Sequence, residues 1–241
     1  MTELSIFGNS VGDEGTRAIC EAIQSNKETK LASLNLGYNR ISQVGVKSVT
    51  AMLAVTSSVT SVNVLSNQLN MESADLLLKV KAEKPNLRTL CGLTHDETEL
   101  DLSRCGLGPG DAKLLAPEIL VMGSITSIGK DGLNLKDNDL GGEGWGAIFA
   151  AVCSSKENKI ASIDASYEGI GPSGAKLVAK ALRESVAEPI TGTRPATTMP
   201  PSTPMPLLLR SSSVKESARI SLIGISLNTS MLVLASTAAE S

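Results

Sequence analysis

Residues 31–41 read LASLNLGYNRI, and this stretch decides the fold. Its apolar residues stand at the first, fourth, sixth and eleventh positions, and Asn39 stands at the ninth. The same spacing recurs in MTELSIFGNSV at residues 1–11 and, with conservative changes, in VTSVNVLSNQL at residues 59–69. A pattern that returns along a chain indicates stacked structural repeats, each of which buries its apolar face against its neighbours.

Three further copies follow at residues 97–107, 130–140 and 160–170. They are less regular, because Glu97 and Lys130 stand in the first apolar position of the fourth and fifth copies. Between successive sixth-position residues the steps are 30, 28, 38, 33 and 30 residues. A period near 28–30 residues leaves room for one short strand and one full helix in each repeat.

The two long steps predict insertions at residues 87–99 and 128–132. Insertions in repeat proteins form loops on one face and often carry binding residues. They are equally consistent with tolerated drift, since lengthening a surface loop costs little free energy. Both interpretations stay open at the level of sequence.

Helical periodicity fills the intervals between the strand motifs. In residues 14–24 the apolar residues Ala18, Ile19, Ala22 and Ile23 recur at the spacing of an amphipathic helix. Glycine pairs between strand motif and helix supply the tight turns that a short connection needs. The sequence therefore predicts an α/β fold, a curved solenoid with parallel strands on the concave face and helices on the convex face.

The ninth residue of the motif has a structural role. An asparagine there can turn inward and satisfy backbone groups where the strand ends, as a buried polar side chain must. Cys105 occupies this position in the fourth copy, and Glu168 occupies it in the sixth. We interpret Cys105 as part of this ladder and not as a reactive thiol.

Three segments are expected along the chain. Residues 1–186 hold about six repeats, residues 187–219 form a linker rich in Pro, Ser and Thr, and residues 220–241 form an apolar and Ser-rich tail. Within the tail, Ile220, Ile223, Ile225 and Asn228 match the repeat motif, so it is either a degenerate repeat strand or a segment without a fixed fold. No polar capping repeat is evident at either end of the array, which favours a fragment of a longer array, self-association, or a tail that acts as a lid.

Composition excludes several functional classes. The formal net charge is −3, and the chain contains only one Trp, two Tyr and two Phe, which argues against nucleic-acid binding. The first ten residues lack the apolar region of a signal peptide. Four scattered cysteines indicate reduced thiols and an intracellular, cytoplasmic location. We expect no membrane association and no cofactor.

The repeats resemble the ribonuclease-inhibitor-like class of leucine-rich repeats. The resemblance covers about residues 1–186 and rests on the strand motif, the period, and the continuation that reads NSVGDEG, NRISQVG, NDLGGEG and, with Glu in place of Asn, EGIGPSG. This resemblance implies a protein-binding function. The class includes enzyme inhibitors, sensor regions of innate-immunity receptors and activators of a small nuclear GTPase.

The concave face is the expected protein-binding surface, because strand residues between the core positions point away from the core. The fifth, seventh and eighth positions of the motif supply its residues. The predicted binding residues are Asn35, Tyr38, Asn63, Asp101, Arg104, Asn134, Lys136, Asp137, Asp164 and Tyr167. Tyr and Arg are enriched at interface hot spots, although such side chains are also ordinary on a solvated surface.

The sequence contains no recognisable catalytic motif, so we expect no enzymatic activity. The single histidine, His95, lies in an acidic stretch with Asp96, Glu97 and Glu99. A cation could bind there, but the spacing matches no known metal-ligand set, which favours a solvated loop.

Three functional hypotheses follow. The first is a non-enzymatic scaffold that binds a protein on its concave face. The second is a regulator of a small GTPase, for which Arg40 and Arg104 are the candidate contact residues. The third is a truncated repeat protein that retains no partner. The sequence does not identify the partner.

Overall fold

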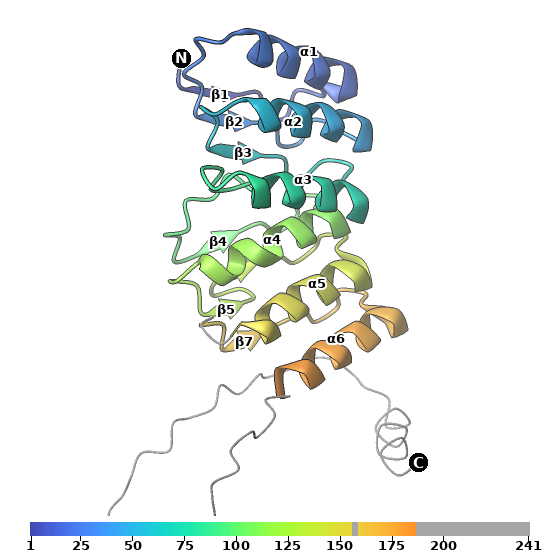
Figure 1. Cartoon of the computed structure of the whole chain (residues 1–241). Helices are drawn as coiled ribbons and strands as arrows, with labels where there is room; N and C mark the ends of the chain where they lie inside the picture. Colours follow the sequence, from blue (N-terminus) through green and yellow to red (C-terminus); the bar gives the residue numbers. More distant parts are fainter. Residues whose placement is uncertain (156–158, 187–241) are drawn as a thin grey trace, which may run out of the picture.

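The computed structural model describes residues 1–155 and 159–186, which form a stack of strand–helix units with strands along one side and helices along the other (Figure 1). In chain order the elements are β1 (Glu3–Ser5), α1 (Gly12–Ser25), β2 (Ser33–Asn35), α2 (Gln43–Val55), β3 (Ser61–Asn63), α3 (Met71–Glu83), β4 (Leu100–Asp101), α4 (Pro109–Val121), β5 (Ser127–Ile128), β6 (Leu133–Asn134), α5 (Gly141–Ser154), β7 (Ser162–Ile163) and α6 (Gly171–Val186). The predicted linker at 187–219 and the tail at 220–241 lie outside the described residues.

Every strand pair in the described residues is parallel, as the predicted α/β solenoid requires. One sheet has the order β1-β2-β3, in which Leu4, Leu34 and Val62 stand side by side. The other has the order β4-β6-β5-β7. The predicted fold class is therefore confirmed, with one difference: the strands form two sheets.

The motif positions form the core. In the second repeat Leu31, Leu34, Leu36 and Ile41 are each at most 2% exposed. Each such side chain stabilises the fold by about 1.5–3 kcal/mol relative to an exposed position. The helices complete the core from the other side.

We call the strand segment of each repeat, motif positions one to eleven, a rung. The structure corrects the predicted frame of the fourth and fifth rungs. Leu87 and Ile125, which are 3% and 0% exposed, fill the first position, in place of Glu97 and Lys130. Leu90 fills the fourth position of the fourth rung. Each insertion therefore lies inside its rung, after the fourth position, and not before the rung begins.

The two interrupted rungs differ in outcome. In the fifth rung, the short insertion keeps the sheet continuous, because Ile128 pairs with both Leu133 and Ile163. In the fourth rung, residues 88–92 run beside β3, but the chain then leaves the sheet and returns at Leu100, which pairs with Leu133. β3 and β4 therefore share no ladder within the described residues, and the solenoid contains a break between its two sheets.

Candidate functional site

The break between β3 and β4 changes the hydrogen bonding of both rungs. In an intact pair of rungs, the sixth and eighth amides donate to the fifth and seventh carbonyls of the next rung, as Leu36 N does to Asn63 O at 2.8 Å. At the break, Val64 N donates to Leu90 O at 3.1 Å, and Ser66 N donates to a carboxylate oxygen of Asp111 at 3.1 Å. The donors that would serve the fourth rung are therefore engaged elsewhere.

The acceptors of the fourth rung lose those partners. Asp101 O and Ser103 O stand at the fifth and seventh positions, on the side of the rung that faces β3. The Cys105 thiol donates to Ser103 O at 3.4 Å, which is a weak bond. The rung thus presents backbone acceptors toward the break.

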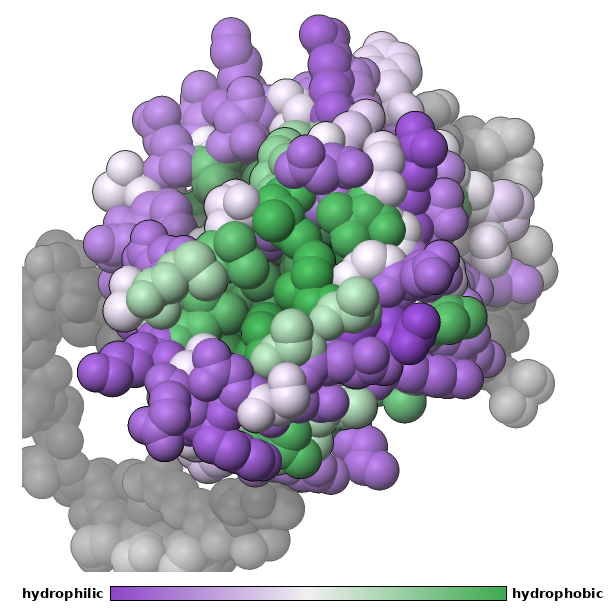
Figure 2. All heavy atoms as spheres, turned by 90° about the horizontal axis from the view of Figure 1, so that it is seen from above, coloured by the Kyte–Doolittle hydropathy of each residue, from purple (hydrophilic) through white to green (hydrophobic). Residues whose placement is uncertain are grey.

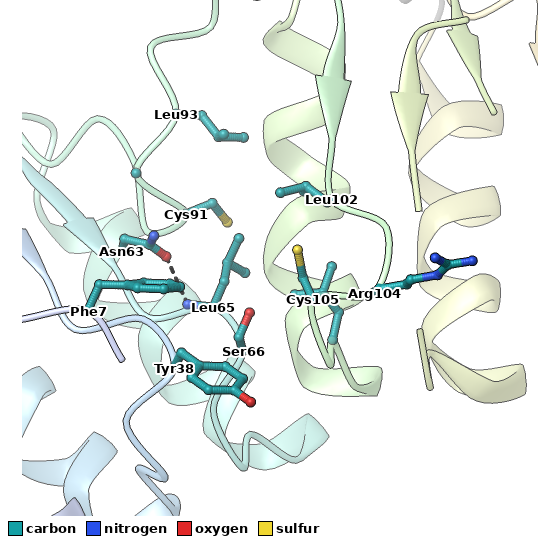
Figure 3. A pocket seen from close by; sticks show the side chains of 12 residues that line it. Phe7, Tyr38, Asn63, Leu65, Ser66, Cys91, Leu93, Leu102, Arg104 and Cys105 are labelled. Atoms are coloured by element: carbon teal, nitrogen blue, oxygen red, sulfur yellow. Dashed lines mark hydrogen bonds between the residues drawn. The ribbon is translucent and has the colours of Figure 1, made fainter. Parts of the chain in front are cut away.

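A pocket of about 450 Å³ lies at this break on the strand side. Figure 3 shows its lining, which comes from both sheets and from the inserted segment. The lining residues are Phe7, Tyr38, Asn63, Leu65, Ser66, Cys91, Gly92, Leu93, Leu102, Arg104, Cys105 and Leu107.

The pocket is mainly apolar, with an aromatic rim. Phe7 and Tyr38 stack with their ring centroids 6.0 Å apart, and they are 55% and 59% exposed. Leu65 and Leu102 form apolar wall from the two sheets (Figure 3). The Arg104 guanidinium points away from the pocket and contacts Asp137 at 3.0 Å, so only the stem of Arg104 contributes to the lining. Such a lining suits an apolar or aromatic side chain of a ligand.

A buried carboxylate fixes the inserted segment that forms one wall. Glu118, on α4, is 1% exposed. Its Oε1 accepts from Lys81 Nζ at 2.9 Å and from Leu90 N at 2.8 Å. Its Oε2 accepts from Thr89 Oγ1 at 2.6 Å and lies 3.1 Å from His95 Nε2. A buried charge is tolerated only when it is satisfied in this way.

Polar residues replace apolar or small ones in the helices beside the break. Glu118 stands where the other repeats have Ala22, Met52, Val80, Ala151 and Ala181. Lys81 stands where they have Ile23, Leu53, Ile119, Val152 and Leu182. Glu118 accepts a hydrogen bond from Leu90 N of the interrupted rung, and Lys81 pairs with Glu118.

Asp111 is a third polar residue at a helix position that holds a small residue in the other repeats. It stands where the other repeats have Gly15, Gly45, Ser73, Gly144 and Gly174. The Asp111 carboxylate accepts from Gly108 N at 2.9 Å, as well as from Ser66 N, and is fully buried. Burial raises the pKa of Asp111 to about 7, against the opposing effect of these two backbone donors. Asp111 thereby holds Ser66, a pocket residue, in place.

The asparagine ladder is interrupted at the same point. Asn67 Oδ1 accepts from Asn39 N and Ile41 N of the preceding rung, both at 2.9 Å. Cys105, the next ninth-position residue, has no amide oxygen with which to accept from Asn67 N and Leu69 N. Cys105 therefore replaces only the donor function of the ladder asparagine, through its bond to Ser103 O, and not the acceptor function.

Comparison with protein families agrees with this geometry. A family model described as Leucine Rich repeat matches residues 1–20, 27–49 and 98–116. This chain is a leucine-rich-repeat protein. Leucine-rich repeats are in general protein-interaction scaffolds, and proteins of the family are typically not enzymes. Assignment to the ribonuclease-inhibitor-like class stays a prediction.

Two further observations bear on the relatives and on the helices of the chain. No curated protein matches the chain. Across residues 1–155 and 159–186, no helix has both the length and the apolar character needed to cross a membrane.

The predicted binding residues of this leucine-rich-repeat protein divide into three groups. The fifth-position residues lie at the end of a strand or directly after it, and each side chain accepts a hydrogen bond from the amide two residues later. These residues are Asn35, Asn63, Asp101, Asn134 and Asp164, with distances of 2.9–3.2 Å. Their primary role is to form Asx turns, and only Asn63 among them lines the pocket.

The eighth-position residues lie outside the strands. Tyr38, Arg104, Asp137 and Tyr167 all have positive φ, from 55° to 65°, so they stand in the turn that follows each strand. The prediction that these residues are strand residues is wrong, because the strands end at the fourth or fifth motif position and the backbone then enters a turn. Tyr38 and Arg104 reach the pocket, whereas Tyr167 is fully exposed, far along the chain from it.

A charged ladder covers the second sheet. Lys136 Nζ contacts Asp164 Oδ2 at 3.0 Å, and Arg104 contacts Asp137. The hydrogen bond to Asp164 raises the pKa of Lys136. The charged side chains on this face of the second sheet thus pair with one another, while the break presents apolar surface.

The acidic loop near His95 uses its polar side chains in hydrogen bonds within the chain. Asp96 and Glu97 accept hydrogen bonds from Thr94, and His95 contacts Glu118. Within the described residues, no group of three or more His, Cys, Asp or Glu side chains could hold a metal ion.

Sequence reasoning missed several pocket residues. Phe7 and Leu65 were detectable, because apolar side chains at the seventh position stand where other repeats have small or polar residues. Cys91 and Leu93 were hidden by the assumption that residues 87–99 precede the rung. Glu118, which supports the pocket, was detectable only by aligning the helices.

Proposed function

We propose that this chain is a non-enzymatic scaffold that binds a partner protein on the strand side of the solenoid, with the pocket at the break as its anchor point. The observation that carries the proposal is the pocket itself, an apolar hollow of about 450 Å³ between two sheets. Apolar surface at the centre of an interface, with aromatic residues beside it, is typical of binding hot spots.

The partner contributes an extended segment with an apolar or aromatic side chain. The segment lies along the fourth rung, where Asp101 O and Ser103 O lack the donors of an intact ladder. Extended peptides bind exposed sheet edges by donating to such carbonyls, and pockets beside the edge select the side chain. The polar fifth-position residues and the Lys136–Asp164 pair form the rim of this surface.

The chain works in a reducing, intracellular compartment in this proposal. All four cysteines are free, and burial raises the pKa of Cys20 and Cys91. Buried thiols with raised pKa are inert packing residues, which suits reduced cysteines.

The test compares two tyrosines at the same motif position. The full chain and the variants Tyr38→Ala and Tyr167→Ala serve as baits for affinity capture, and captured proteins are quantified by mass spectrometry. Both tyrosines are exposed and have positive φ, so the matched changes cost similar stability, but only Tyr38 lines the pocket.

We expect a partner that the full chain and the Tyr167→Ala variant retain and that the Tyr38→Ala variant loses, with binding at least about tenfold weaker for Tyr38→Ala. The partner's binding segment, synthesised as a peptide, should show the same order in a direct titration. Equal capture by all three baits would reject the pocket as the binding site.

A further inference from the structure

The N-terminal end of the solenoid carries an apolar face with a polar border, which Figure 2 shows from above. Leu4, Ile6 and Ile19 are only partly buried there, although they pack against the core. Their counterparts in the second rung, Leu34 and Leu36, are 0% exposed. A repeat that stacked on this end would bury the same positions.

Within residues 1–155 and 159–186, no strand pairs with the outer edge of β1. Ser33 N donates to Thr2 O of the preceding rung at 3.1 Å, so odd-numbered motif positions direct their backbone groups toward the preceding rung. In the first rung these are the N–H and C=O groups of Glu3 and Ser5 on β1 and of Phe7 after it. They are in place to pair with a parallel strand.

Asn9 has the orientation of an inner ladder residue. Asn39 Oδ1 accepts from Asn9 N at 2.9 Å and from Val11 N at 3.3 Å, both in the preceding rung. Asn9 makes the matching donor bonds, to Ile6 O at 2.9 Å and Phe7 O at 3.0 Å. Its Oδ1 therefore faces the end of the stack, where a further rung would supply two amides.

Gly15 provides the matching helix contact. A Cβ at Gly45 would lie 2.6 Å from a side-chain oxygen of Asp13, and a Cβ at Gly174 would lie 2.5 Å from Gly142. In both cases the glycine allows the preceding helix to approach. A Cβ at Gly15 would lie 2.5 Å from the Val11 side chain of its own repeat and would meet no neighbouring repeat in the described residues.

We propose that the N-terminal end binds the C-terminal end of a second copy of this chain, head to tail, so that β1 pairs with β7 of the second copy. In this register, the amides of Glu168 and Ile170 at the ninth and eleventh positions donate to Asn9 Oδ1. Pro172, which is exposed, packs against Gly15. The proposal does not depend on the concave-face function, because it uses a different surface.

Charge favours this pairing over two N-terminal ends. The exposed charged residues of α1 are Glu14, Arg17 and Glu21. Those of α6 are Lys176, Lys180, Arg183 and Glu184. Glu21 and Lys180 share one motif position, six residues after Gly15 and Gly174. Neighbouring helices pair charges at a shared position elsewhere in the stack, as Asp75 and Lys113 do at 2.6 Å.

A head-to-tail contact does not close on itself, so association continues with concentration. Sedimentation velocity of the full chain over a wide concentration range tests this. We expect the weight-average mass to rise steadily above the monomer mass of 25.0 kDa.

Three variants locate the contact. Ser5→Pro removes an amide that points outward, which an edge strand tolerates, and should leave the chain monomeric with an unchanged thermal transition. Glu21→Lys and Lys180→Glu should each weaken association roughly fivefold, and the double exchange should restore it. Lys79→Glu, an exposed change on α3, is the control and should have no effect.

Two results would overturn the proposal. One is a monomer at every concentration. The other is association that Ser5→Pro and both charge changes leave intact. If Ser5→Pro and Glu21→Lys act but Lys180→Glu does not, the contact joins two N-terminal ends, and the head-to-tail register is wrong.

Discussion

The first three rungs and the fourth rung satisfy their backbone N–H and C=O groups with different hydrogen-bond partners. In the first three, asparagine amides and strand-to-strand bonds satisfy the backbone, as the two amides on Asn39 Oδ1 show. At the break, the carboxylates of Glu118 and Asp111 take that role from α4 by accepting from Leu90 N and Ser66 N, and Lys81 pairs with Glu118. The comparison teaches that a repeat can lose part of its strand when polar residues at three helix positions compensate.

The two insertions have different effects on the continuity of the sheet. The insertion in the fifth rung leaves the sheet continuous, and the helix that follows this rung, α5, keeps Ala151 and Val152 at the positions of Glu118 and Ile119. The longer insertion in the fourth rung separates the sheets and creates the pocket. Length therefore decides whether an interruption is absorbed or becomes a surface feature.

The largest expected effect lies in the intact region. Asn39→Ala removes five hydrogen bonds from a fully buried site and leaves backbone groups of two rungs unsatisfied. We expect a loss of about 3–5 kcal/mol in the free energy of unfolding. Cys105→Ala removes only one weak bond and should cost about 1 kcal/mol or less. Denaturant titration of both variants checks the contrast, and equal losses would contradict it.

The next effect concerns the buried carboxylate at the break. Glu118→Ala leaves Lys81, Thr89 and Leu90 N without their acceptor and should destabilise the fold by about 3 kcal/mol. Hydrogen exchange should show the loss first in residues 88–95. As a control, Glu83→Ala changes an exposed carboxylate of α3 and should cost less than about 0.5 kcal/mol. A uniform loss of protection across both sheets would show that Glu118 is not specific to the inserted segment.

A third effect depends on pH and accumulates gradually, unit by unit. The pKa of Asp111 is raised from 3.8 to about 7, so the folded state binds its proton more tightly than the unfolded state does. The stabilisation is complete below about pH 4 and is lost as the pH rises through about 7, by at most roughly 1.4 kcal/mol per pH unit. Urea titrations between pH 4 and pH 8 should show a shallower dependence for Asp111→Asn than for the natural chain. Parallel curves would contradict the raised pKa.

The regular part of the fold was predictable from the sequence. The motif positions of the first three rungs, the helix face of α1 and the parallel order follow from periodicity alone, because every apolar position of these rungs repeats. The frame of the fourth and fifth rungs was not predicted, since Leu87 and Ile125 lie a full insertion away from the residues that complete their rungs. Motif spacing assumes a continuous strand, and nothing local to Glu97 or Lys130 marks the interruption.

The binding surface was predicted only in part. Tyr38, Asn63 and Arg104 line the pocket, but spacing could not show that the Arg104 head turns toward Asp137. It could not show either that fifth-position side chains bond their own turns. These outcomes depend on which neighbour each polar group finds in three dimensions.

The most direct test of the central claim is to restore the interrupted rung. Deletion of residues 90–99 joins Thr89 to Leu100 and gives LRTLDLSRCGL, which fits the repeat motif. The variant also carries Lys81→Leu and Glu118→Met, the residues of the second repeat at those positions. Amide hydrogen exchange at residues 61–66 is then measured. The deletion removes Leu90 O, the acceptor of Val64 N. If the break alone separates the sheets, β3 pairs with the restored rung, Val64 N donates to Asp101 O instead, and its slow exchange is kept. Fast exchange at Val64 would contradict the account, because the separation would then have another cause.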